Sequence, residues 1–140
     1  MASFVAQSEG IISLCPPSAA RAVATSVADL GFKGLYCDAN AVNPETASQV
    51  SEVIAQGGGT YIDGSVISFS GLRLYLSGQR AGDFRRAYFD CAAGSAHGPP
   101  AASELEVIDM GTDSAVAASA LKVGYRLPSL YGNPSNKLGE

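Results

Sequence analysis

The sequence predicts an α/β fold built on a mostly parallel sheet. Short apolar runs that suit buried strands alternate with stretches in which apolar residues recur every three or four positions, as on one face of a helix. The order strand, helix, strand, helix, strand, with short connections, implies right-handed crossovers between parallel neighbours. With 140 residues, 46% of them hydrophobic and 16% charged, the chain has the size and composition of one globular domain.

The first strand and helix are marked by their ends. Residues 10–15 form an apolar run that the Pro16-Pro17 pair stops. Ser18 is then placed to cap a helix over residues 20–30, whose apolar residues share one face and which Gly31 closes.

The next stretch organises the chain. Residues 35–37 are an apolar run that suits a strand covered on both faces. Asn43 can cap the following helix, and Pro44 occupies its first position. Asp38 and Asn40 lie in the loop between strand and helix, and ligands of open α/β sheets bind in such loops. This loop is therefore the first candidate site.

Further elements follow at short intervals. The second helix ends at the glycine triplet 57–59, and residues 60–67 are expected to form a strand. Residues 72–76 alternate between leucine and other side chains, which predicts a half-buried strand at or near a sheet edge.

The last third of the chain is less regular. We expect a helix over residues 83–92, a loop to Ser103, a strand over residues 104–110 and a helix over residues 113–125. Residues 126–140 have little periodicity and are expected to form an irregular or disordered tail.

Composition excludes several classes of function. The net charge is −4 and there is no run of Lys or Arg, so we expect no nucleic-acid partner. There is no apolar run of the ~18 residues that a membrane helix needs, and no signal peptide is apparent, so we expect no membrane partner and a cytoplasmic location. The three cysteines have no ligand or disulfide spacing, which indicates reduced core thiols and no metal site.

The loop motifs, in their order, carry a resemblance. Asp38, Asn40, Ala41 and Pro44 stand at the conserved positions of an Asp-x-Ser-Thr-x-x-Pro substrate loop, with Ser and Thr replaced. Residues 63–69 follow the next strand where Asp-x-Pro-Val-Ser-Gly-Gly would stand, and residues 117–125 look like the start of a long interdomain helix. Over residues 8–125 the chain resembles the β-hydroxyacid dehydrogenases, the superfamily of 6-phosphogluconate and 3-hydroxyisobutyrate dehydrogenases, and in particular its less-characterised NAD(P)-dependent oxidoreductase branch.

The resemblance implies a fold and a division of the chain. The fold would be a partial Rossmann-like, doubly wound sheet that lacks the first dinucleotide-binding βαβ unit. Residues 1–125 would form the partial NAD(P)-binding domain with the start of the interdomain helix, and residues 126–140 the tail. No Gly-x-Gly-x-x-Gly follows any strand, and the match stops at Tyr125, so we expect an oxidoreductase truncated at both ends.

The resemblance also implies an activity and the residues that carry it. The activity would be NAD- or NADP-dependent hydride transfer to or from a small hydroxy-acid-like substrate. Lys122 would be the catalytic general acid/base. The residues implied for the cofactor are Pro16, Pro17, Asp38 and Asn40, and those for the substrate are Asn40, Ala41 and Ile67.

Other interpretations stay open beside this one. The chain is an enzyme only if a cofactor site survives without the glycine motif and the helical domain. The alternative is a catalytically inactive α/β module that dimerises or binds a partner through an exposed sheet edge; an unrelated α/β binding domain is a third. Asp38 and Asn40 equally suit turn formation and helix capping. Lys122 suits a plain helix surface, and Asp63 suits a residue that ties down a loop.

Overall fold

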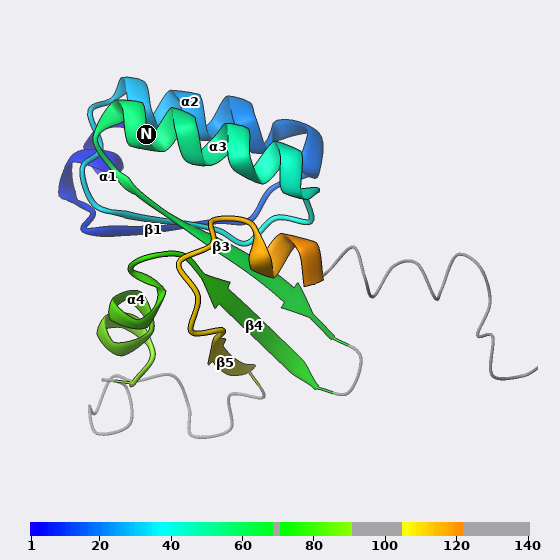
Figure 1. Cartoon of the computed structure of the whole chain (residues 1–140). Helices are drawn as coiled ribbons and strands as arrows, with labels where there is room; N and C mark the ends of the chain where they lie inside the picture. Colours follow the sequence, from blue (N-terminus) through cyan, green and yellow to red (C-terminus); the bar gives the residue numbers. More distant parts are fainter. Residues whose placement is uncertain (69–70, 91–104, 122–140) are drawn as a thin grey trace, which may run out of the picture.

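The computed structural model describes residues 1–68, 71–90 and 105–121. These residues form a five-stranded sheet in the order β1-β2-β3-β4-β5 (Figure 1). The strands are β1 (Gly10–Ser13), β2 (Leu35–Asp38), β3 (Thr60–Ile67), β4 (Leu72–Ser77) and β5 (Leu105–Asp109). The helices are α1 (Ala2–Gln7), α2 (Ala20–Asp29), α3 (Pro44–Gly57) and α4 (Ala81–Tyr88), and residues 117–121 are also helical.

The sheet is mostly parallel, as the sequence predicts. β1, β2 and β3 run in one direction, and β4 and β5 run together in the other, so that only the β3–β4 pair is antiparallel within the described sheet. The prediction that residues 72–76 form a half-buried strand at or near an edge is confirmed, because β4 lies next to β5, the last strand of the described sheet. The alternation of its side chains reports that Leu74 and Leu76 are buried on one face while the other face is partly open, and it carries no information about the neighbours of the strand.

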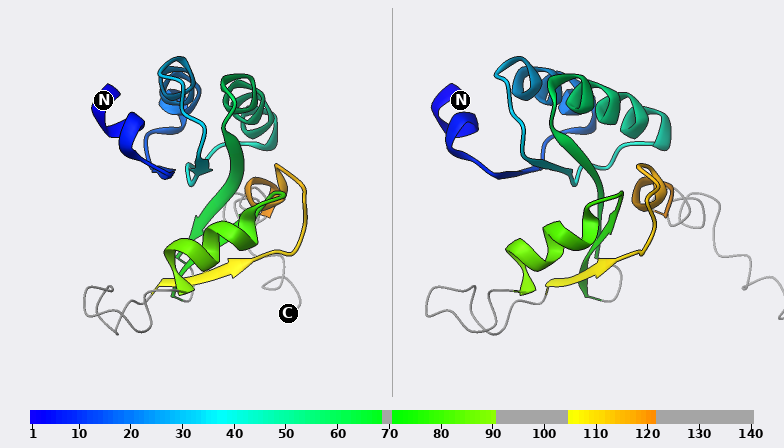
Figure 2. Two further views of the ribbon diagram at one scale, coloured as in Figure 1. Left: turned by 90° about the vertical axis from the view of Figure 1, so that its left-hand side faces the viewer. Right: turned by 60° about the vertical axis from the view of Figure 1, so that its left-hand side comes forward.

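Helices cover the two faces of the sheet unequally. On one face, α1, α2 and α3 pack over Ile11, Tyr36 and Tyr61, which are aligned across β1, β2 and β3 (Figures 1 and 2). On the other face, α4 packs its buried Phe84 over a cluster of strand residues: Leu35, Cys37, Ile62, Leu74 and Leu76. Burial on both faces explains why β2 reads as a continuous apolar run.

Local signals set the ends of α3. Asn43 Oδ1 accepts a hydrogen bond of 2.8 Å from Thr46 N, and Pro44 occupies the first turn. Gly58 ends the helix with φ +90°, a left-handed conformation that glycine adopts without a steric penalty. The predicted cap, first-turn proline and glycine stop are all confirmed.

The predicted start of α2 at residue 20 is confirmed, but its predicted cap and the predicted start of the last helix are wrong. A 3₁₀ turn at Pro17–Ala19 precedes α2, and no side chain caps the helix, so Ser18 has no capping role. The helix expected from residue 113 begins only at residue 117, because the hydroxyls of Thr112 and Ser114 accept hydrogen bonds from Ser114 N and Val116 N and hold a turn there. Helix α1 was not predicted. Lys122, Cys91, the predicted loop that ends at Ser103 and the predicted tail over residues 126–140 lie outside the described residues.

Gly34, just before β2, lies against the backbone of Glu9, just before β1. A Cβ atom at Gly34 would lie 2.1 Å from the carbonyl oxygen of Glu9, to which Leu35 N donates a hydrogen bond of 2.9 Å. We expect Gly34→Ala to lower the free energy of unfolding by about 2–3 kcal/mol, because the backbone of β1 must shift. The midpoint of urea unfolding measures this change.

Gly31→Ala is the matched control. Gly31 has φ +78° but nothing within 4 Å of an added Cβ, so only its backbone conformation resists the change, at about 1 kcal/mol. Equal losses in the two variants would show that the contact with Glu9 is not the determining factor.

Candidate functional site

Four polar side chains form a row across the sheet. Ser13 ends β1, Asp38 ends β2, Asp63 lies in the middle of β3 and Ser77 ends β4. The strand register places them side by side, Ser13 with Asp38, Asp38 with Asp63 and Asp63 with Ser77. All four are buried, the two aspartates completely. This polar row lies at the carboxyl edge of the parallel strands, where α/β folds bind ligands.

Asn40 connects the loops that follow β1 and β2. Its backbone N–H donates to Asp38 Oδ1 at 3.0 Å, and its side-chain Nδ2 donates to Ser13 Oγ at 3.1 Å. Asn40 Oδ1 accepts a hydrogen bond from Cys15 N. The second oxygen of Asp38, Oδ2, is buried without a hydrogen-bond partner among the described residues. Within the described residues, Asp38 Oδ2 is thus an acceptor of the polar row that no protein donor satisfies.

Asp63 holds the beginning of the helix at residues 117–121. Its Oδ2 accepts a hydrogen bond of 2.7 Å from Ser119 N, and its Oδ1 accepts one from the Ser119 hydroxyl. Ala118 N donates to Ser77 Oγ at 3.1 Å. The carboxylate therefore satisfies one backbone N–H group, that of Ser119, at a helix start, where a negative charge is favoured. This contact agrees with the interpretation of Asp63 as a residue that ties down a segment.

The burial of two neighbouring carboxyl groups changes their ionisation. Burial raises the pKa of Asp63 to about 6; the hydrogen bonds from Ser119 oppose this rise, and the charge of Asp38 adds to it. Burial also raises the pKa of Asp38, against the hydrogen bonds from Asn40. None of the ion pairs within the described ranges includes either aspartate. The row can therefore accept or release a proton close to neutral pH.

Burial also raises the pKa of two groups beside the row. Burial raises the pKa of the Tyr36 phenol to about 12. It raises the pKa of the Cys37 thiol too, which keeps that free cysteine protonated and unreactive.

The structure brings only some of the residues implied for cofactor and substrate to the polar row. Asp38 and Asn40 meet at the polar row, Pro16 and Pro17 are exposed on the loop beside it, and half-buried Ala41 follows directly. Ile67 lies farther along β3, where it pairs with Arg73 of β4. It is four residues beyond Asp63, so about 13 Å of extended chain separates it from the polar row. Lys122 is outside the described residues. Their roles remain predictions.

Three serines of this site, Ser13, Ser77 and Ser119, are not among the residues that the sequence predicts for it. A signal exists for the first two, because each follows directly on the apolar residues of its strand, as Asp38 does. No local signal marks Ser119, whose partner Asp63 is 56 positions away.

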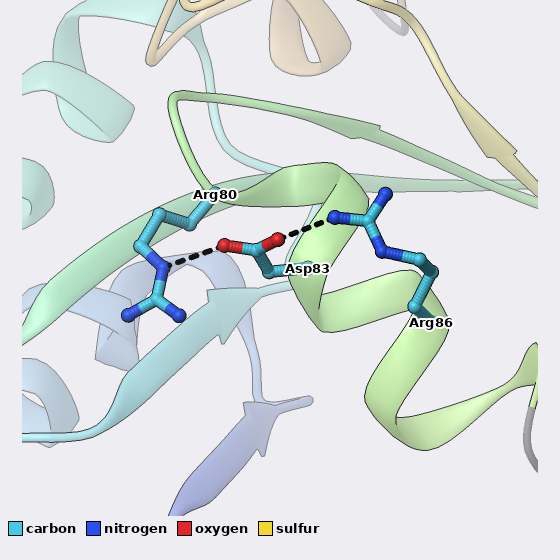
Figure 3. Close-up of polar contacts among 3 residues, drawn as sticks. All are labelled: Arg80, Asp83 and Arg86. Carbon is cyan, nitrogen blue, oxygen red and sulfur yellow. Dashed lines mark hydrogen bonds and ion pairs between the residues drawn. The ribbon is translucent and has the colours of Figure 1, made fainter.

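A second polar cluster lies at the beginning of α4 (Figure 3). Arg80 Nε contacts Asp83 Oδ2 at 2.9 Å, and Arg86 contacts Asp83 Oδ1. All three side chains are at least 43% exposed, so solvent screens the pairs and they contribute little to stability. We regard this cluster as a solvated helix surface.

Other kinds of site are not evident in the part of the chain that the structure describes. No group of three or more His, Cys, Asp or Glu residues there is placed to hold a metal ion. No helix in the same ranges is long and apolar enough to cross a membrane.

The raised pKa of Asp63 predicts that the stability of the fold decreases as the pH rises, opposite to the effect of a carboxyl group whose pKa is lowered by folding. In the unfolded chain the pKa returns to about 3.9, so between about pH 4 and pH 6 the folded state binds more protons, and stability falls as the pH rises. Two pKa units correspond to about 3 kcal/mol. Urea unfolding from pH 4.5 to 7.5 should show the greater stability at the acidic end.

Two variants isolate Asp63 in this experiment. Asp63→Asn should weaken the dependence on pH, because Asp63 no longer titrates and only Asp38 of the pair keeps a raised pKa. Ser119→Ala removes a hydrogen bond that lowers the pKa of Asp63, so the fall in stability should extend to higher pH. A wild-type stability that rises steadily with pH would contradict the assignment.

Comparison with known proteins places the fold. No protein-family model matches the sequence, and no curated protein matches it. Solved structures do match. The 3-hydroxyisobutyrate dehydrogenase of Mycobacterium tuberculosis, solved with L-serine, is 16% identical with a TM-score of 0.64, and the match covers 98% of this chain and 51% of that one.

Two further structures agree. A variant imine reductase from Myxococcus stipitatus, in complex with NAD⁺, is 18% identical with a TM-score of 0.66, covering 98% of this chain and 46% of that one. A conserved protein of unknown function, whose structure resembles 3-hydroxyacid dehydrogenases, is 23% identical with a TM-score of 0.59, covering 81% and 40%.

These matches confirm the resemblance at the level of the fold. The chain spans about half the length of the structures it matches, or less. The predicted partial Rossmann-like α/β fold is confirmed, and the chain shares it with the hydroxyacid dehydrogenase and imine reductase structures.

Proposed function

We propose that this chain contributes the nicotinamide side of an NAD(P)-dependent oxidoreductase site that acts on a small hydroxy-acid-like substrate. The observation that carries the proposal is the polar row of Ser13, Asp38, Asp63 and Ser77 at the carboxyl edge of the parallel strands. Its support is the position of that edge, where this class of fold binds nucleotides, and the NAD⁺ complex of one matching structure.

The residues present fit one end of the cofactor. Asp38 Oδ2 is an acceptor without a partner among the described residues, and it would suit a hydroxyl or carboxamide donor. Asn40 would hold the loop beside it, and Pro16 and Pro17 would line the exposed approach. When bound, the cofactor would supply or accept the hydride. The sequence has no glycine-rich motif for the pyrophosphate, so the other end would need further groups.

The substrate and the proton are assigned in the same way. Asn40 and Ala41 would contact the substrate directly after β2, with Ile67 farther along β3. Lys122 follows the helical residues 117–121, whose start is anchored at Asp63, and it would move the proton. For that role it would need a pKa lowered by burial or by a neighbouring cation.

A second candidate function rests on a different observation. One edge of the sheet, along β1, has no neighbouring strand in the described part of the structure. An inactive α/β module that forms a homodimer would use such an edge. A cytoplasmic location fits either candidate.

Calorimetric titration of the full chain with NADH and with NADPH tests the first proposal. We expect binding in the micromolar range, and Asn40→Ala should weaken it at least tenfold because both loops lose their link. Asn43→Ala is the matched control, since it removes the cap of α3 at a cost of about 1 kcal/mol of stability without touching the row. A cooperative melt without any binding of either nucleotide would favour the inactive module.

Lys122→Met tests the assigned acid/base separately. We expect this variant to keep nucleotide binding and to lose at least a hundredfold in the rate of hydride transfer, in line with the usual contribution of general acid–base catalysis. The readout is oxidation of NADPH or NADH at 340 nm with small 2-oxo acids or 3-oxo acids. An unchanged rate would remove Lys122 from the mechanism.

A further inference from the structure

A small apolar cluster joins three loops beside the polar row. Its buried members are Ala20, Val42 and Ala47, and half-buried Cys15 and Val116 pack against them. Cys15 follows β1, Val42 lies in the loop after β2, and Val116 follows β5. This loop cluster therefore brings together three segments that are far apart in the sequence, between the starts of α2 and α3.

The same segments carry polar contacts of the candidate site. Cys15 N donates a hydrogen bond to Asn40 Oδ1, which ties the loop after β1 to the loop after β2. Ser119 N, three positions after Val116, donates to Asp63 Oδ2 at 2.7 Å. The loop cluster therefore connects the Asn40 loop to the helical segment that is anchored at Asp63.

Backbone contacts fix Val116 at the start of this helical segment. Val116 N donates to Ser114 Oγ at 3.4 Å, and Val116 O accepts a hydrogen bond of 2.9 Å from Ala120 N. The side chain of Val116 is β-branched and has little rotamer freedom, so a shift of its backbone is passed on to the residues that it touches. Ala20 and Ala47 have no exposed surface and short side chains, so the two valines are the largest apolar groups that fill the loop cluster.

We propose that Val116 is a positioning residue for hydride transfer: through the loop cluster it sets the placement of the Asn40 loop relative to the helical segment anchored at Asp63. This role rests on the proposed function, in which Asn40 holds the cofactor loop and Lys122, directly after that segment, moves the proton. Val116 itself touches neither cofactor nor substrate. The rate of transfer depends steeply on such placement, because a displacement of about 1 Å can cost about a hundredfold.

Amide hydrogen exchange of the full chain, followed by NMR, tests the connection without any ligand. Val116→Ala should speed exchange at Ser119 N, close to the change, and at Cys15 N, across the loop cluster, by at least about fivefold. Val107→Ala is the matched control, because this half-buried valine packs against the cluster under α4 and should leave both amides unchanged. Both rates are compared with that of Ile62 N in the buried central strand, which reports global unfolding.

Kinetic measurements separate positioning from a merely structural effect. With NADPH or NADH and a small 2-oxo acid, Val116→Ala should lower kcat about tenfold or more, while the dissociation constant of the nucleotide changes less than about threefold. The nucleotide is affected less because Asn40 Nδ2 keeps its hydrogen bond to Ser13 Oγ, which does not involve the loop cluster. Val116→Ile retains the branched side chain and should restore kcat, and Val107→Ala should keep the wild-type value.

Three results would count against this role of Val116. Equal exchange at Ser119 N and Cys15 N in Val116→Ala and Val107→Ala would overturn it, whatever the activity of the chain. A fall in kcat of the same size in these two variants would overturn it as well. A folded wild-type chain that binds neither nucleotide would overturn the proposed function and, with it, the role of Val116 in hydride transfer. Circular dichroism melts check that all the variants fold.

Discussion

The burial of Asp63 in the middle of the sheet is the constraint on which the rest of the structure depends. A carboxyl group without exposure is costly to ionise, and this one accepts hydrogen bonds from the backbone and the hydroxyl of Ser119. Those bonds fix a segment that comes late in the chain against a strand from its middle. Burial raises the pKa of this carboxyl group to about 6, although the hydrogen bonds from Ser119 oppose the rise.

The segment before Ser119 joins otherwise separate clusters. Ala115 packs on the core between α2, α3 and the sheet, and Val116 packs on the small cluster of Ala20, Val42 and Ala47. The helical residues after it begin at the polar row. The proposed role of Lys122 depends on this arrangement, because a general acid/base must approach the cofactor from an anchored element.

The two edges of interest differ in chemistry. The carboxyl edge is polar and its side chains are mostly buried; the β1 edge is apolar and its side chains are exposed. A ligand that needs oriented hydrogen bonds suits the first, and a strand suits the second. The nucleotide binding that we propose concerns the first edge, and the alternative of strand pairing concerns the second.

Much of the fold follows from local sequence. Asn43, Pro44 and Gly58 determine α3, and the apolar runs place β2 and β3, because capping, first-turn proline and left-handed glycine depend on a few neighbouring residues. The pairing of loop residues Asp38 and Asn40 at a strand end was also predictable. The tertiary structure alone decided that β4 runs antiparallel to β3, that Ser119 bonds to Asp63, and that four polar residues form one row. Strand order, register and contacts over 56 positions arise from the packing of whole elements, and no short stretch of sequence contains that information.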